Sequence, residues 1–244
     1  MSPRIRGSLR VGVIIAAGGK GRRLGGGVPK QFRPIGGMPI IERTMRLFQE
    51  HPGVHEIVIV TPPRYRNKVA GIAGQAKCSK VTRVVSGGAE RQHSVWNGMN
   101  AFLAVPDILL IHDAVRPLVS AAIVTGVIHE AARHKAAVAA VRVKDTIKVE
   151  QPKGFVSSTL DRDRLLAVQT PQGFRVEVIR EAHLKAMRSR YIGTDEASLV
   201  ERFLGIPVRV VEGDYRNLKI TTKEDLEMAE FLVQTGKMER RSRQ

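Results

Sequence analysis

The apolar and polar positions of the chain alternate between two kinds of segment. Short runs of β-branched and small apolar residues predict buried strands, and segments with apolar residues at helical spacing follow most of them and predict helices. The expected strands are 11–17, 55–61, 81–85, 108–111, 136–141, 208–211 and 217–220. The expected helices are 39–51, 64–73, 90–103, 119–134, 176–187 and 195–203. A closing helix follows, with Thr222 as its N-cap and Asp225 three residues later, which approximates a capping box.

This alternation of strands and helices predicts an α/β fold with a doubly wound, mostly parallel sheet and right-handed crossovers. No internal repeat or low-complexity linker interrupts the pattern, so we expect one domain over residues 1–244. In open α/β sheets, ligands bind outside the carboxyl ends of the strands. The loops that follow the strands are therefore the places to look for chemistry.

Residues 144–168 depart from the alternation. This stretch is polar, contains Pro152 and Gly154, and holds two short extended pieces at 145–149 and 154–159. A stretch of this length without a core of its own usually packs against something else. We therefore expect a protruding β-hairpin arm that meets a second subunit.

The loop after the first strand combines glycine with positive charge. Its glycines and cations are Gly18, Gly19, Gly21, Gly25, Gly26, Gly27, Lys20, Arg22, Arg23 and Lys30. Glycine lets backbone N–H groups approach an anion closely, and the cations add charge, so we interpret the loop as a polyphosphate site. The alternative is a glycine-rich turn with solvated cations.

Two common nucleotide motifs are excluded in this loop. A Walker A loop needs Lys followed by Ser or Thr, but Gly21 follows Lys20. The dinucleotide fingerprint needs a third glycine where the chain has Leu24. Neither a P-loop nor a nicotinamide site is supported.

Composition limits the location of the protein. Cys78 is the single cysteine of the sequence, which excludes a disulfide within the chain and a thiolate metal cluster. No segment approaches the roughly 18 continuous apolar residues of a membrane span, and the first ten residues lack the features of a secretory signal. We therefore expect a cytoplasmic protein without membrane contact.

The net charge of +17, from 40 Lys and Arg against 23 Asp and Glu, attracts polyanions. The positive residues are scattered, however, and aromatic residues make up only 5% of the chain. No helix-turn-helix, zinc finger or stacking platform stands out. We expect no specific nucleic-acid binding, and a basic polyanion-binding protein remains the non-enzymatic alternative.

Two further polar groups follow later strands. In residues 86–95, the backbone at Gly88 and Ala89 together with Ser94 could recognise the edge of a base, although a plain strand-to-helix turn explains the same residues. In residues 112–117, Asp113 can hold Mg²⁺ directly or through water, while Arg116 orients the loop or binds phosphate.

The alternative for Asp113 and Arg116 is a structural ion pair. His112 lies between apolar Ile111 and Asp113, and we expect it to be packed rather than catalytic. No serine stands in a nucleophile elbow, so a hydrolytic triad is not supported.

Taken together, the motifs are specific. In order they read AAGGKGRRLG followed by PKQF, SGGAERQHSV, HDAVRP, DTIK, LDRDRLLAVQTPQGF, TDEAS and NLKIT. This series closely resembles the 2-C-methyl-D-erythritol 4-phosphate cytidylyltransferase family over about residues 11–233. The resemblance implies a Rossmann-like nucleotidyltransferase fold and transfer of CMP from CTP to the sugar-alcohol phosphate, with release of pyrophosphate. The product would be 4-diphosphocytidyl-2-C-methyl-D-erythritol, a precursor in non-mevalonate isoprenoid biosynthesis.

The resemblance also implies Mg²⁺ as cofactor and a homodimer whose arms, at about residues 144–168, reach the neighbouring site. The runner-up family, ribitol-5-phosphate cytidylyltransferase, is similar in the opening loop and in HDAVRP. The TDEAS and LDRDRLLAVQTPQ stretches resemble the methylerythritol enzyme instead.

The resemblance assigns roles to single residues. Arg23 and Lys30 match the pair that stabilises the transition state, and Arg162 and Lys219 match the pair that positions the attacking phosphate. Asp113 matches the aspartate on the metal side. The substrate-binding positions are Ala16, Ala17, Gly18, Gly19, Gly88, Ala89, Ser94, Asp113, Arg116, Thr146 and Thr170.

Two positions depart from the family pattern. The opening loop has one more residue before its arginine than the commonest family form, so Arg22 could exchange roles with Arg23. We choose Arg23 because its spacing to Lys30 matches. Ala89 stands where relatives often carry an acidic residue, so a contact there must come from the backbone.

Overall fold

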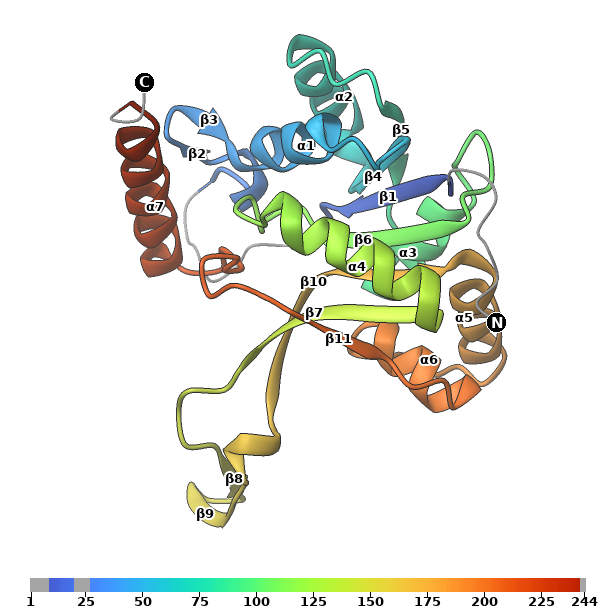
Figure 1. The fold of residues 1–244 in the computed structure, drawn as a ribbon, viewed down its shortest axis with the longest axis vertical. Coiled ribbons are helices and arrows are strands. Elements are labelled where there is room, and N and C mark those ends of the chain that lie inside the picture. Colours follow the sequence, from blue (N-terminus) through green and yellow to red (C-terminus); the bar gives the residue numbers. More distant parts are fainter. Residues whose placement is uncertain (1–8, 20–26, 242–244) are drawn as a thin grey trace.

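A computed structural model describes residues 9–19 and 27–241, and a seven-stranded sheet forms its centre (Figure 1). The strands lie in the order β11-β7-β10-β6-β1-β4-β5. All neighbours in this order pair in parallel except β10, which is antiparallel to both β6 and β7. The strand bounds are β1 Val11–Ala16, β4 Glu56–Thr61, β5 Val81–Ser86, β6 Ile108–Asp113, β7 Ala136–Arg142, β10 Leu166–Arg175 and β11 Arg209–Glu212. The expected mostly parallel sheet is confirmed.

Helices cover both faces of this sheet. The bounds are α1 Ile40–Glu50, α2 Arg66–Gln75, α3 Arg91–Met99, α4 Ala121–His134, α5 Val176–Arg188, α6 Glu196–Leu204 and α7 Lys223–Arg241. Alternate residues of each strand point to opposite faces. Val13 and Ile15 of β1 therefore pack with α1, α2 and α4, while Ile14 packs with α3, α5 and α6. Of the helices in the described ranges, none has the length and apolar content needed to cross a bilayer.

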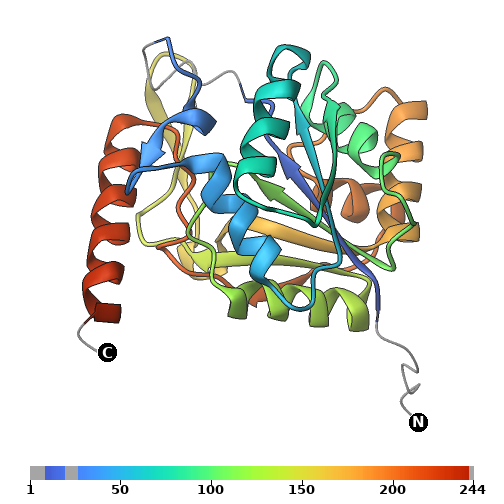
Figure 2. The same cartoon turned by 90° about the horizontal axis from the view of Figure 1, so that it is seen from above.

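The last helix packs beside a small hairpin and not on the sheet. In the view of Figure 2, α7 stands at one side of the molecule next to β2 (Pro34–Ile35) and β3 (Met38–Pro39). Thr222 Oγ1 accepts a hydrogen bond from Asp225 N, and Asp225 Oδ2 accepts one from Thr222 N. These reciprocal bonds confirm the expected cap, because they satisfy donors that a helix start leaves open.

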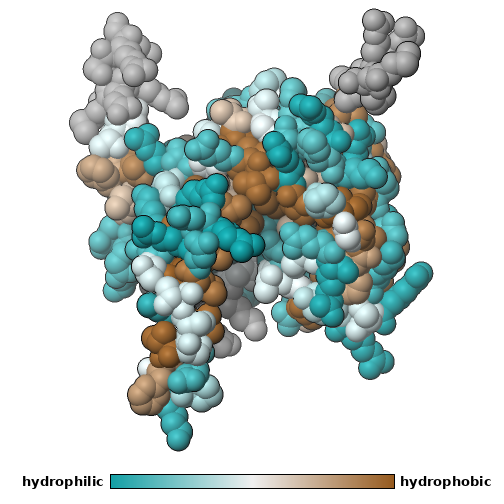
Figure 3. Space-filling model, turned by 60° about the horizontal axis from the view of Figure 1, so that its bottom comes forward, coloured by the Kyte–Doolittle hydropathy of each residue, from teal (hydrophilic) through white to brown (hydrophobic). Residues whose placement is uncertain are grey.

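Residues 144–168 form an arm that extends from the sheet. Its hairpin consists of β8 (Lys148–Gln151) and β9 (Phe155–Thr159), which pair in antiparallel fashion. Figure 1 shows the hairpin well away from the body of the molecule. Phe155 is 64% exposed and Val156 58%, and Figure 3 shows apolar surface on the arm. The expected hairpin is confirmed, and the partner of its apolar surface stays a prediction.

Several predicted boundaries were wrong. Residues 217–220 were expected to be a strand but form no regular element. Here the buried Asn217 side chain donates hydrogen bonds to two oxygens of β10, the side-chain Oε1 of Gln169 and the backbone O of Thr170. The helix expected to reach residue 103 ends at Met99, and Asn100 caps it. The strand expected at 108–111 continues to Asp113, and Pro39, expected inside α1, lies in β3 just before it.

The acid stability of the fold should depend on His183. This side chain is fully buried in α5 and stacks on Trp96, with ring centroids 6.1 Å apart. Neither of its ring nitrogens has a hydrogen-bond partner within the described part of the chain. Burial lowers the pKa of His183 from 6.5 to about 4.

Between these two pKa values the unfolded chain binds a proton that the folded chain does not, so stability falls as pH falls from 6.5 to about 4. We expect the melting temperature of His183→Leu to fall less than that of the wild-type protein between about pH 7 and about pH 5. Thermal unfolding followed by circular dichroism at both pH values measures this. Equal losses in the two proteins would contradict the assignment.

Candidate active site

The carboxyl ends of β1 and β6 bring the first loop beside Asp113. The two strands are in register with Ala16 opposite Asp113. Ala114 N donates to Ala16 O at 3.0 Å, and Ala17 N donates to Val60 O at 2.7 Å, which fixes the point where β1 ends. Gly18 and Gly19 follow and are exposed. The predicted phosphate loop therefore begins at the sheet edge, as expected for an open α/β fold.

Lys30 lies against this loop. It begins a short 3-10 helix, Lys30–Phe32, whose next residue, Gln31, donates from Nε2 to Ala17 O at 3.3 Å. A Cβ atom added to Gly19 would lie 3.3 Å from Lys30 Cε and 3.6 Å from Lys30 Nζ. The lysine side chain thus reaches over the glycine backbone. Arg23 and Arg22 lie outside the described residues, so which arginine joins Lys30 stays a prediction.

Among the described residues, three cations face the Asp113 carboxylate. Lys219 Nζ lies 2.8 Å from Oδ2, Arg91 Nη2 lies 3.5 Å from Oδ1, and Arg116 Nε lies 3.8 Å from Oδ2. Burial alone would raise the pKa of Asp113, but Arg91 and Lys219 outweigh it and hold that pKa far below its ordinary value. The carboxylate is therefore ionised at any neutral pH. The Asp113–Arg116 ion pair that the sequence suggested as an alternative is present, and Lys219 lies closer to the Asp113 carboxylate than Arg116 does.

Asn217 connects Arg116 to β10. Arg116 Nη1 donates to Asn217 O at 2.6 Å, and Asn217 Nδ2 donates to Thr170 O and to Gln169 Oε1, each at 2.9 Å. Thr170 Oγ1 in turn accepts from Asp113 N at 3.1 Å. Thr170 and Arg116 therefore hold the Asp113 backbone and the segment that carries Lys219.

His112 is a packed residue, as expected. It is fully buried, edge-on to Phe48, and its ring nitrogens lie 3.1 Å from Thr170 Oγ1 and 3.0 Å from Arg116 O. Burial lowers the pKa of His112 to about 4, so the ring is neutral at physiological pH. A neutral imidazole with a hydrogen-bond partner at each ring nitrogen suits a structural role beside the Asp113 carboxylate.

The loop after β5 is held by Ser94. Its hydroxyl accepts from Gly88 N at 3.1 Å and donates to Glu90 O at 3.0 Å. A Cβ atom at Gly88 would lie 2.4 Å from His93 Cβ, so a side chain there would force the loop apart. Gly88 and Ala89 are exposed, which leaves their backbone open to a ligand.

The arm residues lie elsewhere in the chain. Arg162 is exposed and donates to Lys144 O at 3.1 Å, inside the arm, and Thr146 is exposed on the same segment. Figure 1 shows the arm extending away from the sheet. In the described part of the chain, no hydrogen bond or ion pair joins Arg162 or Thr146 to Asp113 or Lys219.

Metal ligands are sparse at this edge. No group of three or more His, Cys, Asp and Glu side chains that could hold a metal occurs in the described ranges. Asp113 is instead a single carboxylate surrounded by cations. Within those ranges the site thus offers no metal cage built from protein ligands alone.

Arg91 and Glu196 were missed as site residues. Arg91 Nη1 donates to Glu196 Oε2 in a short contact, and the Glu196 side chain is only 1% exposed. Both residues stand in motifs that the sequence singled out, SGGAERQHSV and TDEAS. The sequence shows only that a basic residue, Arg91, and an acidic residue, Glu196, stand in two separate motifs. It does not show that the two side chains pair, because 105 positions separate them along the chain.

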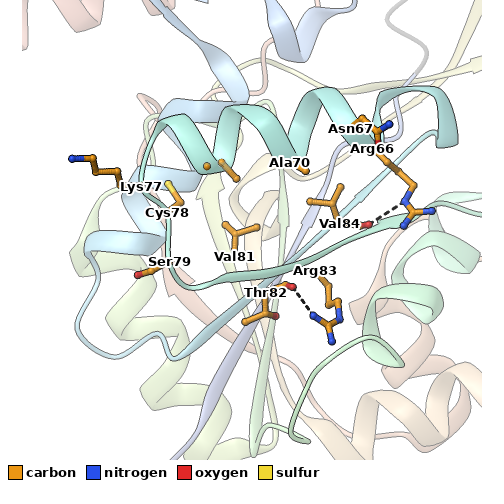
Figure 4. Close-up of a pocket in the computed structure, with 12 residues that line it drawn as sticks. Arg66, Asn67, Ala70, Lys77, Cys78, Ser79, Val81, Thr82, Arg83 and Val84 are labelled. Carbon is orange, nitrogen blue, oxygen red and sulfur yellow. Dashed lines mark hydrogen bonds between the residues drawn. The ribbon is translucent and has the colours of Figure 1, made fainter.

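A cavity of ≈ 530 Å³ lies away from this edge, between α2 and the edge strand β5 (Figure 4). Arg66, Lys77 and Arg83 line it together with apolar residues such as Ala70 and Val81. Of the predicted site residues that the structure describes, none lines it.

Comparison with known proteins agrees with the motifs. The family model described as IspD, 2-C-methyl-D-erythritol 4-phosphate cytidylyltransferase, matches residues 11–235. Relatives of that name include a Symbiobacterium thermophilum protein, 49% identical over 224 residues that cover 92% of this chain and 93% of the relative. A Geobacillus kaustophilus protein of the same name is 46% identical over 220 residues, 90% of this chain and 95% of the relative.

Solved structures resemble the whole fold. The crystal structure of 4-diphosphocytidyl-2C-methyl-D-erythritol synthase from Anaerococcus prevotii is similar with a TM-score of 0.81 at 28% identity, over 93% of this chain and 97% of that one. The 2-C-methyl-D-erythritol 4-phosphate cytidylyltransferase of Thermus thermophilus is similar with a TM-score of 0.75 at 34% identity, over 93% and 99% of the two chains.

Proposed function

Because the chain belongs to the 2-C-methyl-D-erythritol 4-phosphate cytidylyltransferase family, we propose that it transfers CMP from CTP to 2-C-methyl-D-erythritol 4-phosphate. The products are pyrophosphate and 4-diphosphocytidyl-2-C-methyl-D-erythritol, a precursor in non-mevalonate isoprenoid biosynthesis. The observation that carries the proposal is the sheet edge itself, where Gly18, Gly19 and Lys30 lie beside the Asp113–Lys219 pair.

The reaction needs positive charge and alignment more than proton transfer. The acceptor phosphate is already an anion, and it attacks the α-phosphorus of CTP in line while pyrophosphate leaves. The barrier therefore includes repulsion between two anions. At an effective dielectric constant near 20, one cation about 4 Å from an oxyanion contributes roughly 4 kcal/mol before desolvation. Lys30 and Arg23 are the proposed cations on the triphosphate.

Lys219 and Arg162 are the proposed pair that holds the acceptor phosphate. Lys219 is 43% exposed while it bonds Asp113, so its ammonium group can also face a ligand. Arg162 and Thr146 are in the arm, and Arg162 is bonded there to Lys144 O. We therefore infer a homodimer in which the arm of one copy enters the site of the other. The exposed Phe155 and Val156 support this, because apolar arm surface favours a protein partner.

The cytosine ring is proposed to lie against the loop after β5. Exposed backbone at Gly88 and Ala89 supplies donors and acceptors, and Ser94 fixes the shape of the loop. Ala16, Ala17, Gly18 and Gly19 would contact the nucleotide from the end of β1. A base read through backbone groups needs a loop of constant shape.

Mg²⁺ is the proposed cofactor. Mg²⁺ commonly binds one or two carboxylates together with substrate phosphates and keeps several waters. Asp113 fits this pattern, because it is ionised and lies at the edge beside the proposed triphosphate position. When bound, the ion would neutralise charge on the phosphates.

We also retain one nucleotidyltransferase domain and a cytoplasmic location as predictions from the sequence.

Pyrophosphate release tests the proposal. We expect release that requires CTP, Mg²⁺ and 2-C-methyl-D-erythritol 4-phosphate together, and a much smaller rate with D-ribitol 5-phosphate as acceptor. A coupled phosphate assay with both acceptors side by side measures this. Preference for ribitol phosphate would favour the runner-up cytidylyltransferase. Salt-dependent polyanion binding without turnover would favour the basic binding protein.

A further inference from the structure

The buried pair of Arg91 and Glu196 joins two segments of the site. Arg91 is the first residue of α3 and directly follows the loop of residues 87–90 between β5 and α3, which we call the base loop. Glu196 is the first residue of α6. Besides donating to Glu196, Arg91 places Nη2 3.5 Å from Asp113 Oδ1. One guanidinium therefore spans two carboxylates from different parts of the chain.

Neighbouring amides strengthen the same connection. Gln92 Nε2 donates to Tyr191 O at 3.1 Å, and Gln92 Oε1 accepts from Gly193 N at 3.0 Å. On the other side, Gln172 of β10 donates to Asp195 Oδ2 at 2.7 Å and accepts from Ala197 N at 3.3 Å. The first turns of α3 and α6 are thus tied to each other and to the sheet.

Stability of the fold alone does not explain why the buried pair of Arg91 and Glu196 is charged. Burial raises the pKa of Glu196, and Arg91 opposes that rise. The loss of hydration offsets much of the attraction in a buried ion pair, so an apolar pair of similar volume often stabilises a fold equally well. A planar guanidinium bonded to a carboxylate does something an apolar pair cannot, because it fixes direction as well as distance.

We propose that Arg91 and Glu196 are positioning residues, which hold the base loop in the shape that binds the cytosine ring and so determine the affinity for CTP. This inference rests on the proposed function, because the loop meets cytosine only there. The acceptor binds through Lys219 and Arg162, and among the described residues Arg91 is connected to Lys219 only through the Asp113 carboxylate, which both contact. Loss of the pair therefore affects the two substrates unequally.

Glu196→Gln tests the inference, because it keeps the size of the side chain and removes its charge. We expect the KM for CTP to rise about tenfold or more, since a charge-assisted hydrogen bond is lost. The KM for 2-C-methyl-D-erythritol 4-phosphate should change by less than about threefold, because that substrate loses no contact. Steady-state kinetics with each substrate varied in turn give both values. Glu201→Gln, an exposed position on the same helix, is the matched control and should leave both KM values unchanged.

Arg91→Lys provides a second variant that keeps the positive charge. An ammonium group cannot span both carboxylates as a guanidinium does, so the same unequal rise in KM is expected. An unchanged KM for CTP in a folded variant, or an equal rise in both KM values, would overturn the inference. If the wild-type protein releases no pyrophosphate, the proposed function fails instead. If it does and both variants bind CTP normally, only the inference fails.

Discussion

Replacing Lys30 by alanine is expected to lower kcat by about 100-fold or more, the size of effect seen when one electrostatic contact to a transition state is removed. The lysine side chain reaches over Gly19 at the end of β1, where the triphosphate is proposed to bind. Its ammonium group is proposed to stabilise the negative charge that develops on the phosphate oxygens as pyrophosphate leaves. The loss should therefore fall on kcat more than on the KM for CTP.

Single-turnover kinetics with saturating CTP separate the chemical step from product release. Lys223→Ala removes a lysine that is exposed at the start of α7, and it should leave kcat unchanged. That control shows whether a change in net charge alone slows the enzyme. Turnover of Lys30→Ala near the wild-type rate would remove this lysine from the chemistry.

Local pattern predicted most of the elements. A strand such as Glu56–Thr61 is apolar throughout because it is buried on both faces, and this is visible in the sequence. The strand Leu166–Arg175 was missed because it carries Gln169, Pro171 and Gln172 in its middle. Those glutamines bond to Asp214 O and to Asp195 Oδ2, so their polarity reflects distant contacts that no window along the chain contains.

The site divides in the same way. Asp113 and Lys30 were predicted because each stands in a motif at a strand end. The contact between Asp113 and Lys219, and that between Arg91 and Glu196, join residues more than a hundred positions apart. Only the sheet order, with β10 inserted between β7 and β6, brings these segments together. Composition and spacing carry no information on that order.

Arg162→Ala is expected to lower kcat/KM for the acceptor by about 100-fold, because a charge-assisted contact to its phosphate is removed while CTP still binds. Varying the acceptor at saturating CTP measures the loss, and a direct CTP titration shows that the nucleotide site is intact. Arg133→Ala, an exposed arginine in the last turn of α4, is the matched control. An unchanged kcat/KM for the acceptor would exclude Arg162 from its binding.

Mixing Arg162→Ala with Lys30→Ala then tests which subunit the arm serves. If the arm acts in the neighbouring site, each mixed dimer contains one site with an intact Lys30 and an intact Arg162. Random exchange in an equimolar mixture makes half of the dimers mixed, so about a quarter of all sites should be active in a two-fold symmetric dimer. If the arm acts in its own subunit, every site keeps one defect and mixing restores nothing. Lack of recovery after subunit exchange, verified by mass spectrometry, would therefore contradict the crossed arm while leaving the role of Arg162 itself untouched.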